Sequence, residues 1–308
     1  MRTEVFRLGL IGAGRMGRTH LRALEASSAV AVTGVAEPVA AGRSAVAAPG
    51  RAVFEDVDQL LDAGHIDGVL IAAPSDQHVQ LVAKVAAAGL PILCEKPCGF
   101  SSLAIAAARE AAERHDVPLQ VAYWRRYVPA LQALRRRIEQ GDLGELLLVA
   151  SSQWDGQPPA AAFRAHSGGI FIDMGVHEFD QVRWLSGGEL ADVRAVSAPP
   201  SLDPAAGGDV DSAQAIARLS DGATAFVSLG RWFPGGDMAR VEVFGTHDAV
   251  RCDVLDPKDG EQTQLDALVR QAEAFAAFAR GGQLTGASIH DAAAALHAAE
   301  SATVAMAS

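Results

Sequence analysis

Residues 6–17 of the chain read Phe-Arg-Leu-Gly-Leu-Ile-Gly-Ala-Gly-Arg-Met-Gly, and this stretch decides the fold. An apolar run ends at Ile11, three glycines follow with G-x-G-x-x-G spacing, and a helical pattern continues to about Ala26. The first glycine permits a tight turn, the second lets the backbone approach a pyrophosphate, and the third lets helix and strand pack closely. We expect the phosphates of a dinucleotide to bind this turn, at Gly12, Gly14, Arg15, Met16 and Gly17.

An acidic residue stands where a dinucleotide-binding fold selects its cofactor. Glu37 ends the second apolar run, Val30–Ala36, and lies 20 residues after Gly17. A carboxylate at this place accepts hydrogen bonds from the hydroxyls of the adenosine ribose and repels a 2′-phosphate. Pro38 follows with no adjacent arginine, so the sequence predicts NAD in preference to NADP.

The first half of the chain alternates short apolar runs with helical stretches. Fully apolar runs suit strands that are buried on both faces of a parallel sheet with helical crossovers. We expect residues 1–122 to form an NAD-binding α/β Rossmann domain, a doubly wound parallel sheet. Its predicted strands are Phe6–Ile11, Val30–Ala36, Gly68–Ala72, Pro91–Cys94 and Leu119–Ala122.

From about Leu146 the apolar residues partly alternate with polar ones, and turn signals such as Ser220-Asp221-Gly222 separate the segments. This pattern predicts an α+β domain with a largely antiparallel sheet over residues 123–308. Partly alternating strands would leave one sheet face apolar in a monomer, so we expect this domain to form oligomers, and we also expect it to bind the substrate. We expect the terminal helix, residues 288–305, to pack back near the first domain. The predicted strands are Leu146–Trp154, Ala191–Ala198, Ala213–Leu219, Ala223–Gly230 and Arg240–Phe244.

The composition excludes several classes of protein. Of 308 residues, 49% are hydrophobic and 20% charged, which is typical of a soluble globular protein. The longest stretch without a charged residue has 12 residues, too few for a membrane span, and charges near the N-terminus interrupt any signal-peptide core. A net charge of −11 disfavours a nucleic-acid partner. Three cysteines without a CxxC pair indicate a reducing compartment, and we expect a cytoplasmic protein.

Lys96 is one of only three lysines, against 23 arginines. It follows the predicted strand Pro91–Cys94, at the edge where open α/β sheets bind ligands. Burial can tune a lysine towards a neutral pKa, whereas arginine stays charged, so Lys96 is a candidate reactive group. The alternative is an ordinary surface lysine after a strand. The bond between Lys96 and Pro97 is a candidate cis peptide.

A second dense segment places Asp173, His177 and Asp180 on one face of a predicted helix. A histidine beside a carboxylate is a candidate acid–base catalyst, because the carboxylate orients the ring and supports its charged form. One alternative is an ion pair on the helix surface, and another is a metal site made by Asp173, His177 and His166. No further histidine pair supports a metal, so none is expected.

Other candidates carry weaker signals. His78 either points into a cofactor cleft or is a solvated residue in the first turn of a helix. Tyr123-Trp124-Arg125-Arg126-Tyr127 either lines a pocket for a polyhydroxylated substrate or forms a cluster at the junction of the domains. The residues predicted to contact substrate are Arg126, Trp154 and Asp155.

In their order, these motifs resemble the Gfo/Idh/MocA family of sugar and cyclitol oxidoreductases over nearly the whole chain. The resemblance implies that Lys96, Asp173 and His177 are catalytic and that Lys96-Pro97 is cis. It extends the cofactor contacts to Ala73, Pro74, His78, Glu95 and Lys96. The motifs that carry it are Gly12–Gly17, Glu37, Ala73-Pro74 with His78, Glu95-Lys96-Pro97, Arg125-Arg126, Gly141-Asp142-Leu143-Gly144-Glu145, and Gly168-Gly169 with Asp173, Gly175, His177 and Asp180.

The resemblance implies an NAD-dependent dehydrogenase that moves a hydride between nicotinamide and a secondary alcohol of a sugar, an inositol-like cyclitol or a related polyol. It also implies a homodimer or homotetramer. Two alternatives stay open. One is a non-catalytic NAD-binding regulator on the same fold, and the other is a reductase or cofactor-retaining oxidoreductase that works in the opposite direction.

Overall fold

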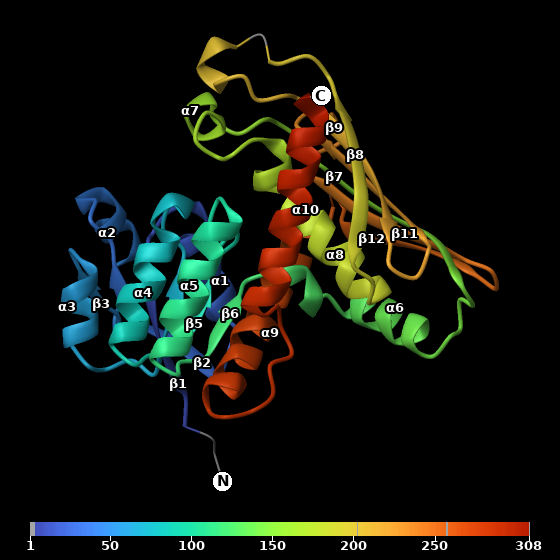
Figure 1. The fold of residues 1–308 in the computed structure, drawn as a ribbon. Helices are drawn as coiled ribbons and strands as arrows, with labels where there is room; N and C mark the ends of the chain where they lie inside the picture. The colour runs from blue at the N-terminus through green and yellow to red at the C-terminus, as the bar shows by residue number, and fades with distance from the viewer. Residues whose placement is uncertain (1–3, 202, 257, 308) are drawn as a thin grey trace. The chain divides into compact units, whose positions relative to one another are not determined.

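The protein is described by a computed structural model that covers residues 4–201, 203–256 and 258–307 (Figure 1). The chain divides into two compact units. The first contains the residues up to Trp124 together with Leu265–His290, and the second contains Arg125–Gln264 together with the residues from Asp291 onward. The chain therefore enters the first unit twice.

The last two helices are divided between the two units. Helix α10, Ile289–Ala307, belongs from Asp291 onward to the second unit, and most of helix α9, Gly260–Ala279, belongs to the first. The reason lies in the side chains. Phe275 of α9 packs edge-on against Phe6 with ring centroids 5.9 Å apart, whereas Asp291 of α10 forms an ion pair with Arg126 of the second unit at 3.2 Å.

The first unit contains a parallel six-stranded sheet in the order β3-β2-β1-β4-β5-β6. All of its strand pairs are parallel, and its central strands are almost entirely buried, so the predicted doubly wound parallel sheet is confirmed. The sequence missed β3, a three-residue edge strand without a buried residue. The strands are β1 Phe6–Ile11, β2 Val30–Ala36, β3 Ala52–Phe54, β4 Gly68–Ile71, β5 Ile92–Cys94 and β6 Leu119–Val121.

Helices connect these parallel strands, and α4 and α5 lie side by side in Figure 1. Asp56 and Ser101 cap α3 and α5 by accepting hydrogen bonds from Gln59 N and Ala104 N. The helices are α1 Arg15–Leu24, α2 Ala40–Val46, α3 Val57–Asp62, α4 His78–Ala87 and α5 Ser102–Arg114, with the short 3₁₀ helix η1 Ser75–Gln77. A further 3₁₀ helix, η2 Trp124–Tyr127, spans the sequence boundary between the two units.

The second unit contains a six-stranded sheet in the order β12-β11-β7-β10-β9-β8. Only the central pair of β7 and β10 is parallel, so the predicted largely antiparallel sheet is confirmed. The sequence missed β12, where Arg251 and Asp253 interrupt the apolar pattern on its exposed face. The strands are β7 Leu146–Trp154, β8 Leu190–Ser197, β9 Ser212–Leu219, β10 Thr224–Gly230, β11 Met238–Gly245 and β12 Ala249–Leu255.

Helix α8 covers one face of this sheet, where Val149 and Ser151 of β7 are fully buried. The opposite face leaves Ile216 and Phe244 about half exposed, at 50% and 42%. The helices of the second unit, besides α10, are α6 Pro129–Glu139, α7 Ala161–Arg164, the π-helix η3 Phe171–Gly175, α8 Val176–Ser186 and the 3₁₀ helix η4 Pro204–Ala206.

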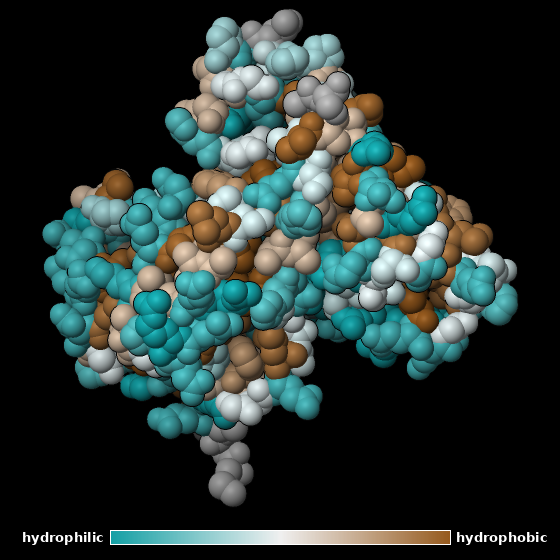
Figure 2. All heavy atoms as spheres, viewed as in Figure 1, coloured by the Kyte–Doolittle hydropathy of each residue, from teal (hydrophilic) through white to brown (hydrophobic). Residues whose placement is uncertain are grey.

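The surface in Figure 2 is mainly hydrophilic, with apolar residues in smaller groups between the polar ones. Among the described residues, no helix has the length and apolar character needed to cross a membrane.

Candidate active site

The glycine turn after β1 contains three glycines. Gly12 and Gly17 have no room for a Cβ atom, whereas Gly14 faces open space. Gly12 has a φ of 95°, and a Cβ there would lie 2.7 Å from Ala72 O. A Cβ on Gly17 would lie 2.0 Å from Gly12 O. Nothing lies within 4 Å of a Cβ on Gly14, which caps α1 without a side-chain hydrogen bond. The first-turn N–H groups of a helix carry partial positive charge, so this open turn fits a dinucleotide phosphate.

Glu37 is fixed beside this turn by the backbone. Its Oε2 accepts a hydrogen bond from Ala13 N at 2.7 Å, and its Oε1 accepts one from Val39 N at 2.8 Å. The side chain is buried, and a Cβ on Gly42 would lie only 2.8 Å from Glu37 Cγ. The carboxylate therefore has little freedom, which suits a group that must meet two ribose hydroxyls in one orientation.

An arginine that the sequence analysis missed lies close to Glu37. Arg43 of α2 donates from Nη1 to Pro38 O at 2.7 Å and to Glu37 O at 3.0 Å, while its Nη2 pairs with Glu55 at 2.8 Å. Pro38 follows Glu37 in the sequence, so no arginine is adjacent along the chain, but helix α2 brings Arg43 close to Glu37 in space. Its guanidinium is held by these three acceptors.

The loop that carries Lys96 begins with a buried ion pair. Glu95 Oε1 lies 2.7 Å from His20 Nε2, and Glu95 Oε2 accepts a hydrogen bond from Lys96 N at 3.2 Å. Burial alone would raise the pKa of Glu95, but the hydrogen bond and charge of His20, with a smaller effect from Lys96, bring it below its ordinary value. His20 lies on α1, so this pair joins the helix after the glycine turn to the Lys96 loop.

Lys96 itself is half-buried, which argues against an ordinary surface lysine. The Lys96–Pro97 peptide bond is cis, as expected.

His78 bridges two loops of the first unit. Its Nδ1 lies 2.8 Å from Pro97 O and its Nε2 lies 2.9 Å from Ala73 O. The side chain is 1% exposed, so the alternative of a solvated first-turn residue is wrong. Burial lowers the pKa of His78, although both carbonyl contacts oppose the change. The ring thus ties the Ala73-Pro74 turn to the cis-proline loop.

The acid–base segment of the second unit starts with a wide helical turn. Asp173 lies in the π-helix η3, and His177 is the second residue of α8, which follows directly. π-Turns inside helices occur frequently at functional sites. His177 and Asp180 are both buried, at 8% and 2% exposure, so the alternative of an ion pair on the helix surface is wrong.

Asp173 is bound by an arginine that no sequence motif indicated. Arg231, directly after β10, donates from Nη1 to Asp173 Oδ2 at 3.1 Å. Its Nε lies 2.8 Å from Asp209 Oδ2, and Asp209 also binds Arg164 at 2.8 Å. These residues come from segments far apart in the chain, and no spacing rule links them.

The arginine pair of the aromatic segment is held by buried carboxylates. Arg126 binds Asp180 through Nε at 3.0 Å and Nη2 at 2.6 Å. Burial raises the pKa of Asp180, and the charge of Arg126 opposes that rise. Arg125 pairs with Glu178, which also accepts from Ser151 Oγ. The predicted substrate residue Arg126 thus has internal partners already.

The other two predicted substrate residues lie in different surroundings. Trp154 donates from Nε1 to Ser228 Oγ at 3.2 Å, on the sheet face opposite α8, so the structure does not bring it together with His177. Asp155 accepts from Gln153 Nε2 at 3.1 Å. Burial raises the pKa of Asp155, and the charges of Asp237 and Asp173 add to the rise.

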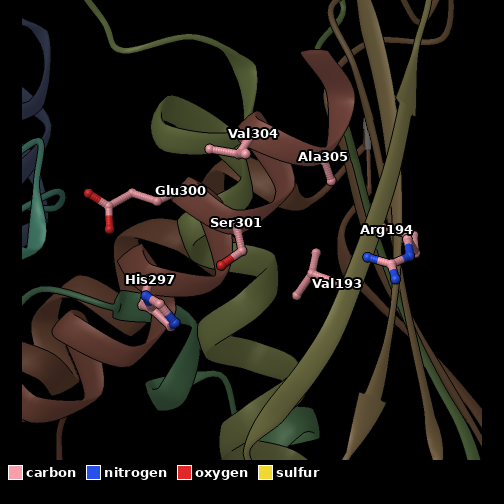
Figure 3. A pocket seen from close by; sticks show the side chains of 7 residues that line it. All are labelled: Val193, Arg194, His297, Glu300, Ser301, Val304 and Ala305. Carbon is pink, nitrogen blue, oxygen red and sulfur yellow. The ribbon is translucent and has the colours of Figure 1, made fainter. Parts of the chain in front are cut away.

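A cavity of about 600 Å³ in the second unit lies apart from all these residues. Figure 3 shows it between α10 and β8, with Val193 pointing towards the helix and Glu300 pointing away from the strand. None of the sequence-predicted site residues lines it. The described residues contain no group of three or more His, Cys, Asp or Glu side chains placed to hold a metal ion, so the alternative of Asp173, His177 and His166 as ligands finds no support.

Two family descriptions match the chain. An oxidoreductase family with an NAD-binding Rossmann fold matches residues 6–123, and the GFO/IDH/MocA C-terminal domain matches residues 131–251. Among similar proteins, the rhizopine catabolism protein MocA of Rhizobium meliloti is 51% identical over 298 residues, which cover 97% of this chain and 94% of the relative. An inositol 2-dehydrogenase of Rhizobium meliloti (strain 1021) is 33% identical and covers 86% and 80%.

A crystal structure of scyllo-inositol dehydrogenase from Lactobacillus casei, with bound NAD(H) and scyllo-inositol, has a TM-score of 0.88 and 25% identity. The match covers 99% of this chain and 97% of that one. The matched domains, the order of the sequence motifs and the glycine turn beside Glu37 all indicate the same family. The chain is a member of the Gfo/Idh/MocA family of oxidoreductases, with an NAD-binding Rossmann domain.

Proposed function

We propose that the protein is an NAD-dependent dehydrogenase of a secondary alcohol in a cyclitol, sugar or related polyol. The observation that carries the proposal is the acid–base set. Half-buried Lys96 and buried His177, preceded by Asp173, stand at the positions to which the family resemblance assigns catalysis. The inositol 2-dehydrogenase relative supports a cyclitol as substrate.

In this proposal the first unit holds the cofactor. The turn at Gly14 receives the phosphates, and the fixed Glu37 carboxylate accepts the ribose hydroxyls and disfavours a 2′-phosphate. His78, Glu95 and the Ala73-Pro74 turn shape the remainder of the cofactor site. Bound NAD supplies the hydride acceptor.

The protein's own residues manage the proton and the charge. His177 takes the proton of the reacting hydroxyl, because a neutral imidazole is a base suited to neutral pH. Asp173 orients the ring and stabilises its charged form. Lys96 stabilises the negative charge that develops on the oxygen, as a fixed cation does in a water-poor site. Asp155 and Arg126 are the proposed contacts to the other hydroxyls of the substrate.

A panel experiment tests the proposal. The protein is incubated with NAD and with myo-inositol, scyllo-inositol, aldoses and rhizopines, and the absorbance of NADH is followed. Oxidation of at least one polyol is expected, and the variant His177→Ala serves as the inactive control. If NAD binds but no substrate exchanges hydride in either direction, the non-catalytic regulator is the better description.

The same panel separates the second alternative. Incubation with NADH and the corresponding ketones measures the reductive direction. A cofactor-retaining enzyme would show bound NADH after gel filtration and would exchange hydride without added cofactor. Reduction of a ketone without oxidation of the corresponding alcohol even at high pH, where the equilibrium favours oxidation, would assign the protein as a reductase.

We also propose a homodimer or homotetramer in the cytoplasm, without a nucleic-acid partner. The half-exposed apolar side chains on the uncovered sheet face of the second unit, such as Ile216 and Phe244, support association. Light scattering at micromolar concentration tests it, and a species of 32.0 kDa alone would count against it.

A further inference from the structure

Arg231 is the most deeply buried cation near the proposed acid–base residues. Its side chain has no exposed surface, and its backbone N donates to Asp211 O at 2.8 Å, which fixes the start of the side chain. Its Nη1 also lies 3.6 Å from Met174 Sδ, beside Asp173. A charge buried this completely is stable only when it is paired.

The partners of Arg231 form an alternating chain of charges. Asp173 lies on one side of the guanidinium and Asp209 on the other. Asp209 is then shared with Arg164, whose Nη2 lies 2.8 Å from Asp211. Asp173 is 14% exposed at one end of this chain and Asp211 is 37% exposed at the other, whereas Arg231, Asp209 and Arg164 between them are 0%, 3% and 5% exposed. The chain therefore joins Asp173 to Asp211 through a buried middle.

A second carboxylate lies next to Arg231 along the backbone. Asp155 directly follows β7, and its backbone N donates to the carbonyl of Gly230, the residue before Arg231, at 2.9 Å. Burial raises the pKa of Asp155 most, and Gln153 of β7, Asp237 before β11, Asp173 of η3 and Arg231 after β10 also act on it. The two aspartates raise its pKa, and Arg231 lowers it. Without Arg231, Asp173 would lose this ion pair and Asp155 would lose the positive charge that lowers its pKa.

We propose that Arg231 is the positioning residue of the site: it fixes the Asp173 carboxylate and balances the negative charge that Asp173 and Asp155 share. This inference rests on the proposed function, in which Asp173 orients the catalytic histidine. Arg231 meets neither substrate nor cofactor in this role. A rigid guanidinium fork suits it better than a lysine, because the fork binds two carboxylates at once in a fixed geometry.

Two variants of Arg231 and one matched control test the inference. Arg231→Gln removes the charge and the fork, while Arg231→Lys keeps the charge but loses the fork. The control, Arg164→Gln, breaks the same chain one step further from Asp173 and leaves the bond between Arg231 and Asp173 in place. Thermal unfolding of all three measures the structural cost, so that activities are compared among folded proteins.

The kinetic result separates positioning from structure. With NAD and the oxidised polyol, Arg231→Gln should lower kcat by about 10- to 100-fold with little change in the affinity for NAD, because a misplaced carboxylate misorients the base. The kcat of Arg231→Lys should fall by about three- to tenfold, and that of Arg164→Gln by less than about threefold. A kcat of Arg231→Gln within threefold of wild type, or an equal loss in Arg164→Gln, would overturn the positioning role.

A spectroscopic result tests the charge balance without catalysis. In protein labelled with ¹³C-aspartate, the Asp155 carboxyl should titrate at higher pH in Arg231→Gln than in wild type, and should be unmoved in Arg231→Lys and Arg164→Gln. An unmoved Asp155 titration in Arg231→Gln contradicts the inference. If Arg231→Gln does not fold, a kcat of Arg231→Lys equal to wild type overturns it. If wild type oxidises no polyol, the proposed function fails, and the titration still decides the role of Arg231.

Discussion

The candidate residues of the two units are held in place by different kinds of partner. In the first unit, backbone groups hold most of them: Glu37 accepts from two backbone N–H groups, and His78 meets two backbone carbonyls. In the second unit, charged side chains hold each other, as Asp173 and Arg231 do, and as Arg126 and Asp180 do. The candidate residues of the first unit therefore depend mainly on chain geometry, and those of the second unit on long-range ion pairs.

This difference predicts that binding and chemistry separate on mutation. His177→Ala should lower kcat by about 10²- to 10⁴-fold, which is the usual contribution of a positioned acid–base group. The affinity for NAD, measured by calorimetry, should stay within about twofold, because the first unit supplies the cofactor contacts. A comparable loss of NAD affinity would contradict the division between the units. A kcat within about threefold of wild type would remove His177 from the mechanism.

The glycine turn offers a matched pair within the first unit. Gly17→Ala places a Cβ 2.0 Å from Gly12 O and should lower the free energy of unfolding by about 1–3 kcal/mol or more. Gly14→Ala places its Cβ in open space, so stability should change by less than about 1 kcal/mol. Its affinity for NAD should nevertheless fall by about tenfold, because the methyl group occupies the space for the phosphates. Unchanged NAD affinity would show that the phosphates bind elsewhere.

The charge of Glu37 should set the preference between cofactors. Wild type should bind NAD at least about tenfold more tightly than NADP, a difference of about 1.4 kcal/mol. Glu37→Gln keeps the size of the side chain and removes its repulsion of the 2′-phosphate, so the gap should narrow. Arg43→Ala in the same background tests whether the neighbouring guanidinium then assists NADP. Equal affinities in wild type would refute the prediction.

Buried carboxyls in the two units should respond to pH in opposite directions. The pKa of Glu95 is lowered from its ordinary value of 4.5, so the ionised side chain stabilises the fold above that pH, and this stabilisation is lost as the pH falls through the pKa of the folded state. The pKa of Asp180 is raised from its ordinary value of 3.8, so the protonated side chain is the form that the fold favours. Its stabilisation is lost as the pH rises from 3.8 through the pKa of the folded state. Urea unfolding of Glu95→Gln and Asp180→Asn between pH 3 and 7, each against wild type, should give slopes of opposite sign. Parallel slopes would contradict one of these assignments.

The sequence revealed residues whose role depends on local spacing, and it did not reveal contacts between residues far apart in the chain. The clash that requires Gly17 lies within one strand–turn–helix, and Gly12 has the positive φ of the same turn, so local spacing reveals both glycines. The pairing of His20 with Glu95 was missed, because 75 residues separate them. Arg231 was missed as well, since it lies 58 residues from Asp173 and has no motif of its own.

Strand prediction succeeded for the fully apolar runs and for most of the alternating ones, including the edge strands β6 and β8, and in the described part of the chain it missed only the edge strands β3 and β12. Strands β3 and β12 lie at the ends of their sheets, and both combine apolar residues with exposed ones. Trp154 was correctly placed at the end of a strand, but the strand alone did not reveal which face it would occupy. That face is set by the pairing with β10, where Ser228 receives its indole N–H.

The double entry of the chain into the first unit has a consequence for biosynthesis. All six strands of the first sheet are synthesised before residue 122, yet Phe275, which packs against Phe6 in that unit's core, is made only after the strands of the second unit. The amino-terminal unit therefore waits for a late segment before its core is complete, although amino-terminal domains usually fold first during synthesis. A nascent chain that pauses before α9 keeps the Phe6 side of that core without its aromatic partner.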